Sequence, residues 1–446
     1  MDLRDELHEA LDEADFPSNG LLAHAISRLD EPKPPTNNRW LASLVAGVIA
    51  VALIATLVLV RASQQAPEQS QPPLRVTSII SGFVTYDFVS TQVGWVAVFT
   101  PSGQTVLAAT SDGGRSWRNQ LELSGLGPTA TIEFVDARHG FLIGNPDGRV
   151  PTLWTTVDGG AHWQARDLPP DAGLLMSSYF LDSQHGWTLT TGSYSGSVPS
   201  TSGVVSQTTD GGQTWHRLGS INTRQALIEQ LRFASPTNGV ITTFPNSGSI
   251  SLFVTQDGGG TWSRRDLLLP PLPAGSQINI QQPAFIGDSG FLVVALLQRA
   301  GPCPSPSSAT QSTAQPCVYE PIGQYLYEST DGGINWSGPK QLNVTGNVQV
   351  VSSTTWVDLS QQGLSRTTDA GATWSISRPL PVPSGWYASQ PQFLDAQRGY
   401  VSLTDSNGKW FAFMNGQGIE GTPPKFALLV TEDGGATWRQ VGLPSA

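Results

Sequence analysis

The chain is poor in charge, and what charge it has is unevenly placed. Only 13% of its 446 residues are charged, with 24 Lys and Arg against 35 Asp and Glu. Residues 1–38 hold nine of the acids and three of the bases, so the remainder is nearly neutral. Because this remainder lacks the basic stripe that phosphate backbones require, nucleic acid is not an expected partner.

Cysteine is almost absent as well. The two cysteines, Cys303 and Cys317, lie in "CPSPSSATQSTAQPC", which is too rich in Pro and Ser to pack as core. The spacing favours a disulfide in an oxidising compartment, where closing such a loop contributes about 3 kcal/mol. The alternative is a pair of separate thiols in a cytosolic loop.

One long hydrophobic run interrupts this polar background. Residues 41–60 contain no charged side chain. As a helix, a run of this length can cross a hydrocarbon core of about 30 Å. Arg39 and Trp40 precede the run and Arg61 follows it, as expected at membrane interfaces. We therefore predict a transmembrane helix over 40–61 that binds the membrane, with a cleaved signal peptide or a buried helix as the alternatives.

The flanking segments suggest an orientation. Three basic residues lie within reach before the span and two lie after it, which favours a cytoplasmic N-terminus. We expect residues 1–39 to form a short helical or disordered cytoplasmic tail, with a possible cytoplasmic partner, and residues 62–73 to form a Pro/Gln-rich linker. The folded body, 74–446, is then extracytoplasmic in a single-pass cell-membrane protein.

The body is rich in turn and strand residues and carries seven copies of one motif. The copies read "TSDGGRSW", "TVDGGAHW", "TTDGGQTW", "TQDGGGTW", "STDGGINW", "TTDAGATW" and "TEDGGATW". Their aspartates and tryptophans are Asp112 and Trp117, Asp158 and Trp163, Asp210 and Trp215, Asp257 and Trp262, Asp331 and Trp336, Asp369 and Trp374, and Asp433 and Trp438. The recurrence predicts one four-stranded unit per copy.

A second element precedes the motif in each unit, an apolar run that ends in Phe and resumes after a Gly-aromatic pair, as in "FVDARHGFLI". Only "STTWVDLS" remains of it in the sixth unit. Naming the four strands A to D in chain order gives ABCD seven times. This pattern predicts an all-β, seven-bladed β-propeller.

The motif is explained by construction. Its glycines supply positive φ, its Asp accepts backbone N–H groups, its Thr bonds across the hairpin and its Trp packs between sheets. Each copy offers one carboxylate where a calcium loop needs several oxygens, and His139, His162, His185 and His216 lack the close-spaced partners of a zinc site. We expect no metal, no cofactor and no catalytic residue among them.

The pattern [ST]-x-D-x-G-x-x-W resembles the Asp-box, or BNR repeat, of sialidases, sortilin-type receptors, some glucanases and the photosystem II assembly and stability factors. In combination with "F-x-D-x-x-x-G-W/F" it is most similar to the last family. The resemblance covers residues 82–440 and implies a scaffold that holds a protein partner. A sialidase would need an Arg-Ile-Pro segment near the start, where this chain has "PLRVTSIISGF".

The units differ in the connection between strands B and C, which is expanded in units three, five and seven. In a propeller the B–C loops share one face, where repeat proteins usually bind. The insertions carry Tyr194 and the group Trp410, Phe411, Phe413 and Met414. We interpret these residues as contacts to a protein partner or glycan; the alternative is that the aromatics plug the central channel.

These patterns together predict a membrane-anchored, non-enzymatic binding or assembly propeller outside the cytoplasm. Two alternatives stay open. One is a surface receptor or glycan-binding module that signals through its tail, and the other is a sialidase-like glycosidase, whose acidic residues would converge from distant strands.

Overall fold

The computed structural model describes residues 76, 78–126, 130–144, 151–168, 174–191, 202–223, 228–243, 250–270, 272–301, 319–375, 378–405 and 424–444. The chain divides into two compact units, Met1–Gln69 and Ser70–Ala446, and every described residue belongs to the second. Among them the structure has no helix that could span a membrane. The predicted tail, membrane helix and linker (1–39, 40–61 and 62–73) lie outside the described residues and stay predictions.

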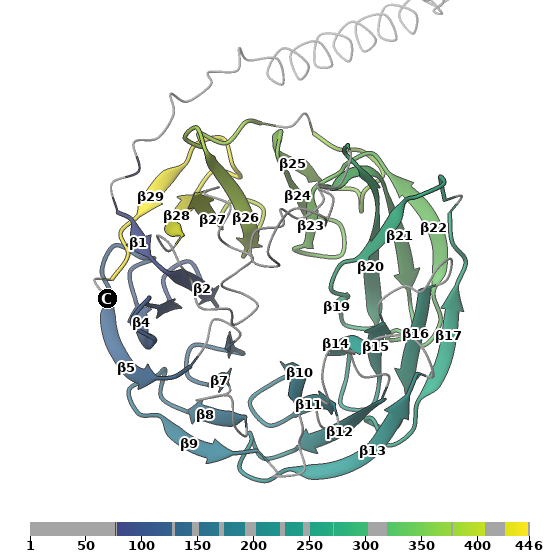
Figure 1. The fold of residues 1–446 in the computed structure, drawn as a ribbon, viewed down its shortest axis with the longest axis horizontal. Helices are drawn as coiled ribbons and strands as arrows, with labels where there is room; N and C mark the ends of the chain where they lie inside the picture. The colour runs from purple at the N-terminus through teal and green to yellow at the C-terminus, as the bar shows by residue number, and fades with distance from the viewer. Residues whose placement is uncertain are drawn as a thin grey trace, which may run out of the picture. The chain divides into compact units, whose positions relative to one another are not determined.

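The described strands form seven sheets arranged as a ring (Figure 1). Blades one to three comprise β2 (Phe83–Phe88), β3 (Gly94–Phe99), β4 (Gln104–Thr110) and β5 (Arg118–Ser124); β6 (Thr131–Phe134), β7 (Gly140–Gly144), β8 (Thr152–Thr156) and β9 (Gln164–Asp167); and β10 (Leu174–Phe180), β11 (Gly186–Thr191), β12 (Ser202–Thr208) and β13 (His216–Asn222). The first strand of each blade lies nearest the central axis.

Blades four to seven complete the ring. They comprise β14 (Ile228–Phe233), β15 (Gly239–Thr243), β16 (Ile250–Thr255) and β17 (Ser263–Leu267); β18 (Gln277–Ile280), β19 (Ala284–Ile286), β20 (Ser289–Arg299), β21 (Tyr319–Ser329) and β22 (Ser337–Leu342); β23 (Asn347–Val350), β24 (Trp356–Ser360) and β25 (Gly363–Thr367); and β26 (Trp386–Phe393), β27 (Gly399–Asp405), β28 (Lys425–Thr431) and β29 (Arg439–Val441). The seven-bladed propeller predicted from the repeats is confirmed.

Two blades depart from the expected ABCD pattern. Blade six has three strands, and an isolated bridge from Leu364 to Arg378 stands where strand D was expected. In blade five the inner strand is divided into β18 and β19, which both pair with β20. A proline, Pro283, lies in this interruption; because proline has no N–H to donate to the ladder, the break is expected there.

The ring is closed at blade seven, by strands from both ends of the body. The C-terminal strand β29 pairs with β28 from Leu428 to Val430. The N-terminal strand β1 (Ile80–Ser81) pairs with the preceding part of β28. The chain then passes from β1 directly into β2, the inner strand of blade one. Blades seven and one are therefore joined by covalent continuity as well as by packing.

Neighbouring blades are joined by aromatic rings. The Phe that ends an inner strand stacks on the aromatic side chain that follows the Gly of strand B in the preceding blade. Four such pairs have centroid distances of 3.3 to 3.7 Å and interplanar angles of 4° to 10°: Trp95–Phe134, Phe141–Phe180, Trp187–Phe233 and Tyr400–Phe88. Most of these rings are fully buried, so each pair contributes apolar burial and ring contact at a blade interface.

The glycine opposite each Phe is required by this packing. A Cβ on Gly140 would lie 2.2 Å from the ring of Phe134, and a Cβ on Gly94 would lie equally near Phe88. In blade six, where only "STTWVDLS" remains of the second element, the large and small side chains are exchanged. Val350 takes the Phe position and pairs with Trp356, which takes the Gly position. The large ring has moved across the strand pair, and Trp356 is fully buried.

We expect Gly140→Ala to destabilise the fold by about 1–3 kcal/mol, because the added methyl overpacks the Phe134 ring. Gly442→Ala is the matched control, since its Cβ would meet no atom within 4 Å. Denaturant unfolding of the two variants measures the difference. Equal stability of the two variants would show that the ring contact tolerates the extra atom.

Candidate functional site

The seven Asp-boxes share one hydrogen-bond pattern. In blade four the Thr255 hydroxyl donates to Asp257 Oδ1 at 2.8 Å and accepts the Gly259 N–H at 2.9 Å. The Asp257 carboxylate in turn accepts the Thr261 N–H at 2.9 Å and the Thr261 hydroxyl at 2.7 Å. The other six boxes repeat this arrangement, with His162 in blade two and the Asn335 amide in blade five in place of the Thr261 hydroxyl. Each aspartate is thus saturated by its own turn, as the structural interpretation predicted.

These donors favour the ionised carboxylate. Hydrogen bonds from the side chain and backbone of Thr373, followed by that from Thr367, hold the pKa of Asp369 at about 2, below its usual 3.8. In Asp257 the Thr261 backbone N–H is the largest contribution, and the pKa is again about 2. The box aspartates are charged anchors for a hairpin and are not poised for proton transfer near neutral pH.

The tryptophans of the boxes pack edge-on against the inner Phe of their own blade, as in Trp163 with Phe134 (89°) and Trp438 with Phe393 (86°). These two contacts lie within a blade, and the predicted packing between neighbouring sheets stays a prediction. The histidines bond within their own turns: His139 to Asp136 at 2.8 Å, His185 to Asp182 at 2.9 Å. Among the described residues no group of three or more His, Cys, Asp or Glu side chains is placed to hold a metal.

The two faces of the ring differ in regularity. On one face, here called the Asp-box face, the A–B turns have five residues in six blades, for example 135–139, and the Asp-box turns between described C and D strands have seven, for example 157–163. On the other, the B–C face, the B–C connection ranges from two residues in blade six (361–362) to nineteen in blade seven (406–424). Variation is concentrated where the sequence predicted partner binding.

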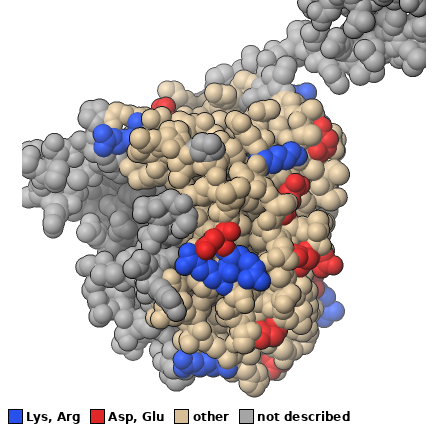
Figure 2. Space-filling view, turned by 90° about the vertical axis from the view of Figure 1, so that its right-hand side faces the viewer, with Lys and Arg blue, Asp and Glu red and all other residues tan. Residues whose placement is uncertain are grey.

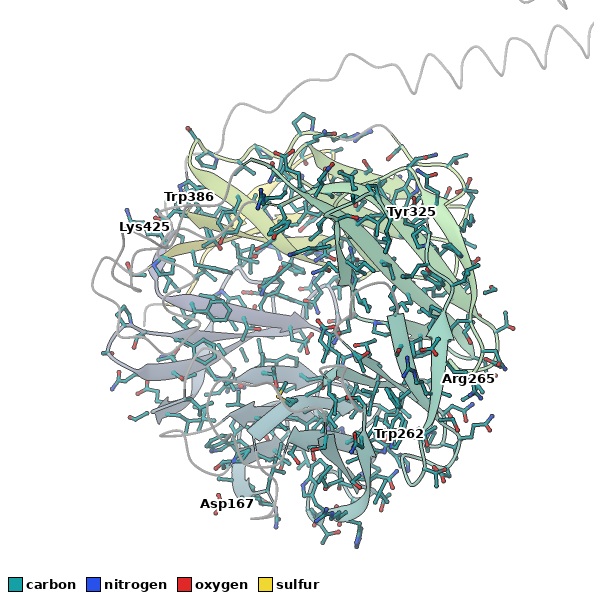
Figure 3. The ribbon with its side chains drawn as sticks, turned by 45° about the vertical axis from the view of Figure 1, so that its right-hand side comes forward. Asp167, Trp262, Arg265, Tyr325, Trp386 and Lys425 are labelled. Atoms are coloured by element: carbon teal, nitrogen blue, oxygen red, sulfur yellow. The ribbon has the colours of Figure 1, made fainter. Side chains whose placement is uncertain are left out.

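The five predicted contact residues, Tyr194, Trp410, Phe411, Phe413 and Met414, lie outside the described residues, as do Cys303 and Cys317. Their roles and the disulfide stay predictions. The foot of the 406–424 connection is described: the Lys425 N–H donates to Asp405 Oδ1 at 2.8 Å, and Trp386 pairs with Asp405. Figure 3 shows Trp386 and Lys425 close together at this edge of blade seven.

Blade five also extends on this face. Strands β20 and β21 each have eleven residues, whereas the B and C strands of the other blades have five to seven. The extra pairs include Gln298 with Glu320 and Arg299 with Tyr319. At about 3.4 Å per residue, the hairpin reaches roughly 13 Å beyond its neighbours. A described part of the blade-five insertion is therefore an extension of the sheet itself.

A ring of polar groups, missed by the sequence analysis, surrounds the axis. It consists of the residue just before the inner Phe, or before Val350 in blade six, and we name it the axial layer: Asp87, Glu133, Tyr179, Arg232, Ala284, Gln349 and Gln392. In several blades the side chain of this residue accepts the backbone N–H of the inner Phe of the next blade. Gln349 does so from Phe393 at 2.7 Å, and Asp87 from Phe134 at 2.6 Å.

The charged members of the axial layer belong to blades one, two and four. Burial raises the pKa of Glu133 to about 7, with Arg232 opposing the shift and Asp87 adding to it. The Arg232 guanidinium stacks over the Tyr179 ring, 4.8 Å from its centroid. The pattern D-F, E-F, Y-F, R-F, A-F, Q-V, Q-F, read one residue before each inner-strand end, is the sequence signal that could have found this layer.

Surface charge elsewhere is dispersed. On the side of the ring that Figure 2 shows, basic side chains lie in small separate groups with acidic side chains nearby. The exposed Arg264, for example, donates to Asp266 at 2.8 Å. The view agrees with the nearly neutral composition of the body.

Comparison with known proteins supports the resemblance inferred from the repeats. Residues 119–225 match the family model described as photosynthesis system II assembly factor YCF48. The matched residues extend from β5 through blades two and three. No curated protein matches the chain.

Solved structures with a similar fold include YCF48 bound to D1 peptide, 17% identical over 76% of this chain and 97% of that one (TM-score 0.47). YCF48 from Cyanidioschyzon merolae is 16% identical over 75% and 96% (TM-score 0.44). An ulvan lyase of polysaccharide lyase family PL25 is 11% identical over 84% and 98% (TM-score 0.46).

The lowered pKa values predict a loss of stability in acid. The pKa of such a carboxyl is about 2 in the folded protein and 3.8 in the unfolded chain. The ionised carboxyl therefore stabilises the fold above pH 4, and this contribution is lost as the pH falls from about 4 to 2. Asp257→Asn should therefore destabilise the protein at pH 7, by roughly 1 kcal/mol, and have little effect near pH 2. Thermal unfolding across this range is the measurement; an equal loss at both pH values would contradict it.

Proposed function

We propose that the protein is a membrane-anchored, non-enzymatic binding propeller that holds a protein partner on its B–C face outside the cytoplasm. Two observations support the proposal. The family model matched by residues 119–225 is that of an assembly factor, and the repeats in that region are the same repeats that build the rest of the ring. The anchor is assigned to residues 40–61, on the uncharged run and its flanking Arg and Trp residues.

The observation that carries the proposal is the contrast between the two faces. The Asp-box face is constrained, because every A–B turn also accepts a hydrogen bond from the Asp-box of its own blade; in blade two the Gly159 N–H donates to Arg138 O at 2.8 Å. The described residues of the B–C face show no such repeated contact, and this face holds the long connections of blades three, five and seven. A scaffold with one repeated face and one variable face is typical of repeat proteins that bind through their loops.

Deleting residues 406–424 and joining Asp405 to Lys425 through a short Gly linker should reduce partner capture at least about tenfold, because it removes four large apolar contacts. The matched control is Val157→Ser, a single exposed apolar side chain on the Asp-box face. Quantitative cross-linking in membranes, compared between the two variants, measures the effect. Unchanged capture by a folded deletion variant would refute the assignment of the B–C face.

The proposed topology has its own test. In intact cells, a membrane-impermeant thiol reagent should label Cys303 and Cys317 only after external reduction, because an oxidising compartment keeps the pair closed. A Cys303→Ser variant is the control, since its remaining thiol should be labelled without reduction. Labelling that requires permeabilised cells would place the propeller in the cytoplasm.

A further inference from the structure

The axial layer is uneven in how its polar atoms are used. In blades six and seven the glutamines are fully engaged: Gln349 bonds to both the N–H and the carbonyl of Phe393, and Gln392 accepts from Phe88 and donates to Asp87. In blades two to four several atoms have no partner among the described residues. These atoms are Glu133 Oε1, the Tyr179 hydroxyl, and Nε and Nη2 of Arg232.

Blade joining uses one oxygen of Glu133, whose Oε2 accepts the Phe180 N–H at 3.3 Å, and it requires neither Tyr179 nor Arg232. In blade three the link to the next blade is made by Ser177, whose hydroxyl accepts the Leu231 N–H at 3.2 Å. Tyr179 is therefore not needed for it. Among the described residues Arg232 donates to one acceptor, the carbonyl of its own neighbour Leu231, at 2.8 Å. A glutamine would satisfy the same backbone groups, as Gln349 does in blade six.

A structural ion pair does not account for them either. Glu133 and Arg232 interact electrostatically, but no guanidinium nitrogen of Arg232 lies within 4.0 Å of a carboxylate oxygen of Glu133. The Tyr179 ring lies against the guanidinium on one side. All three side chains keep part of their surface exposed. In the next blade the corresponding residue is Ala284, the smallest side chain in the layer.

We propose that the axial layer of blades two to four is a binding site for a small carboxylate that also carries hydroxyl or ammonium donors. The unpaired edge of Arg232 presents two N–H groups in the fork geometry that matches a carboxylate. The Tyr179 hydroxyl adds a donor beside it. Glu133, which interacts electrostatically with both Arg232 and Tyr179, supplies the acceptor for the ligand's hydroxyl or ammonium group.

This arrangement selects for the combination of groups. A ligand with a carboxylate alone pairs with Arg232 and leaves Glu133 without a partner. A neutral polyol hydrogen-bonds to Glu133 and leaves Arg232 without a partner. Because a bound ligand displaces water from both charged groups, a ligand that pairs with only one of them binds more weakly than one that carries both groups. Sugar acids and amino acids both have this chemistry, and they are distinguished by the experiment below.

The test uses ligand-observed NMR with the full chain in detergent micelles and four probes: glucuronate, L-alanine, acetate and glucose. We expect glucuronate or L-alanine to bind with a Kd of about 1 mM or below, and acetate and glucose to bind at least about tenfold more weakly. Saturation by glucuronate alone assigns the site to sugar acids, and saturation by L-alanine alone assigns it to amino acids.

Variants connect the binding to the layer. Arg232→Gln removes the charged fork and should weaken binding at least about tenfold, while Arg232→Lys keeps the charge and should give an intermediate loss. Glu133→Gln keeps an acceptor for the Phe180 N–H and tests the ligand's donor group. Arg264→Gln, on an outer strand, is the matched control and should bind like the unmodified chain. Thermal unfolding confirms that each variant is folded.

Three results would overturn the proposal. The first is that neither glucuronate nor L-alanine binds at about 10 mM. The second is that acetate or glucose binds as tightly as the bifunctional probes, and the third is that folded Arg232→Gln binds with unchanged affinity. Partner capture on the B–C face is measured separately, so failure here leaves that function standing, and the reverse also holds.

Discussion

The structure depends on one contact, the inner-strand Phe ring pressed between its own glycine and the aromatic side chain of the preceding blade. Strand pairing holds each blade together, but the ladders end at the blade's edge. The interfaces between blades rest on side chains, and four of them centre on a stacked Phe: Phe134, for example, is stacked on Trp95 and meets Trp163 edge-on. Blade six shows that the size of the ring matters more than its position, since Val350 and Trp356 exchange places across one strand pair.

The Asp-box complements this contact by fixing the hairpin that carries the Trp. Its carboxylate is saturated within eight residues of sequence, so the turn has the same geometry in every blade whatever lies around it. Even Ala370, which stands where the other boxes have their first glycine, adopts a positive φ of 54°, a strained conformation for a residue with a Cβ. Uniformity of this face leaves the other face as the place where insertions disturb neither the blade interfaces nor the hairpins.

Local periodicity was sufficient to predict the number of blades and the strand order of most of them, because both follow from a repeat of about fifty residues. Features that need two distant segments were not predictable. The split outer strand of blade seven joins Ile80 to Phe426, and the axial layer brings Glu133 and Arg232 together across an intervening blade. Among the described residues of blade six an isolated bridge, Leu364 to Arg378, stands where strand D was expected, and the Asp-box of this blade gives no sign of it. The residues chosen for partner contact lie outside the described chain, so their prediction stands untested.

The closure of the ring has a consequence for what the two ends of the body can do. β1 contributes two residues to blade seven, and the Leu443 N–H donates to the Ser78 hydroxyl at 3.0 Å. The Gly82 N–H adds a bond to the carbonyl of Pro424 at 2.9 Å. Residues 78–82 and 424–443 therefore stabilise the same seam, and loss of either segment removes partners from the other. Because Pro424 is also the last residue of the long blade-seven connection, the end of that connection is held to the seam by this backbone hydrogen bond.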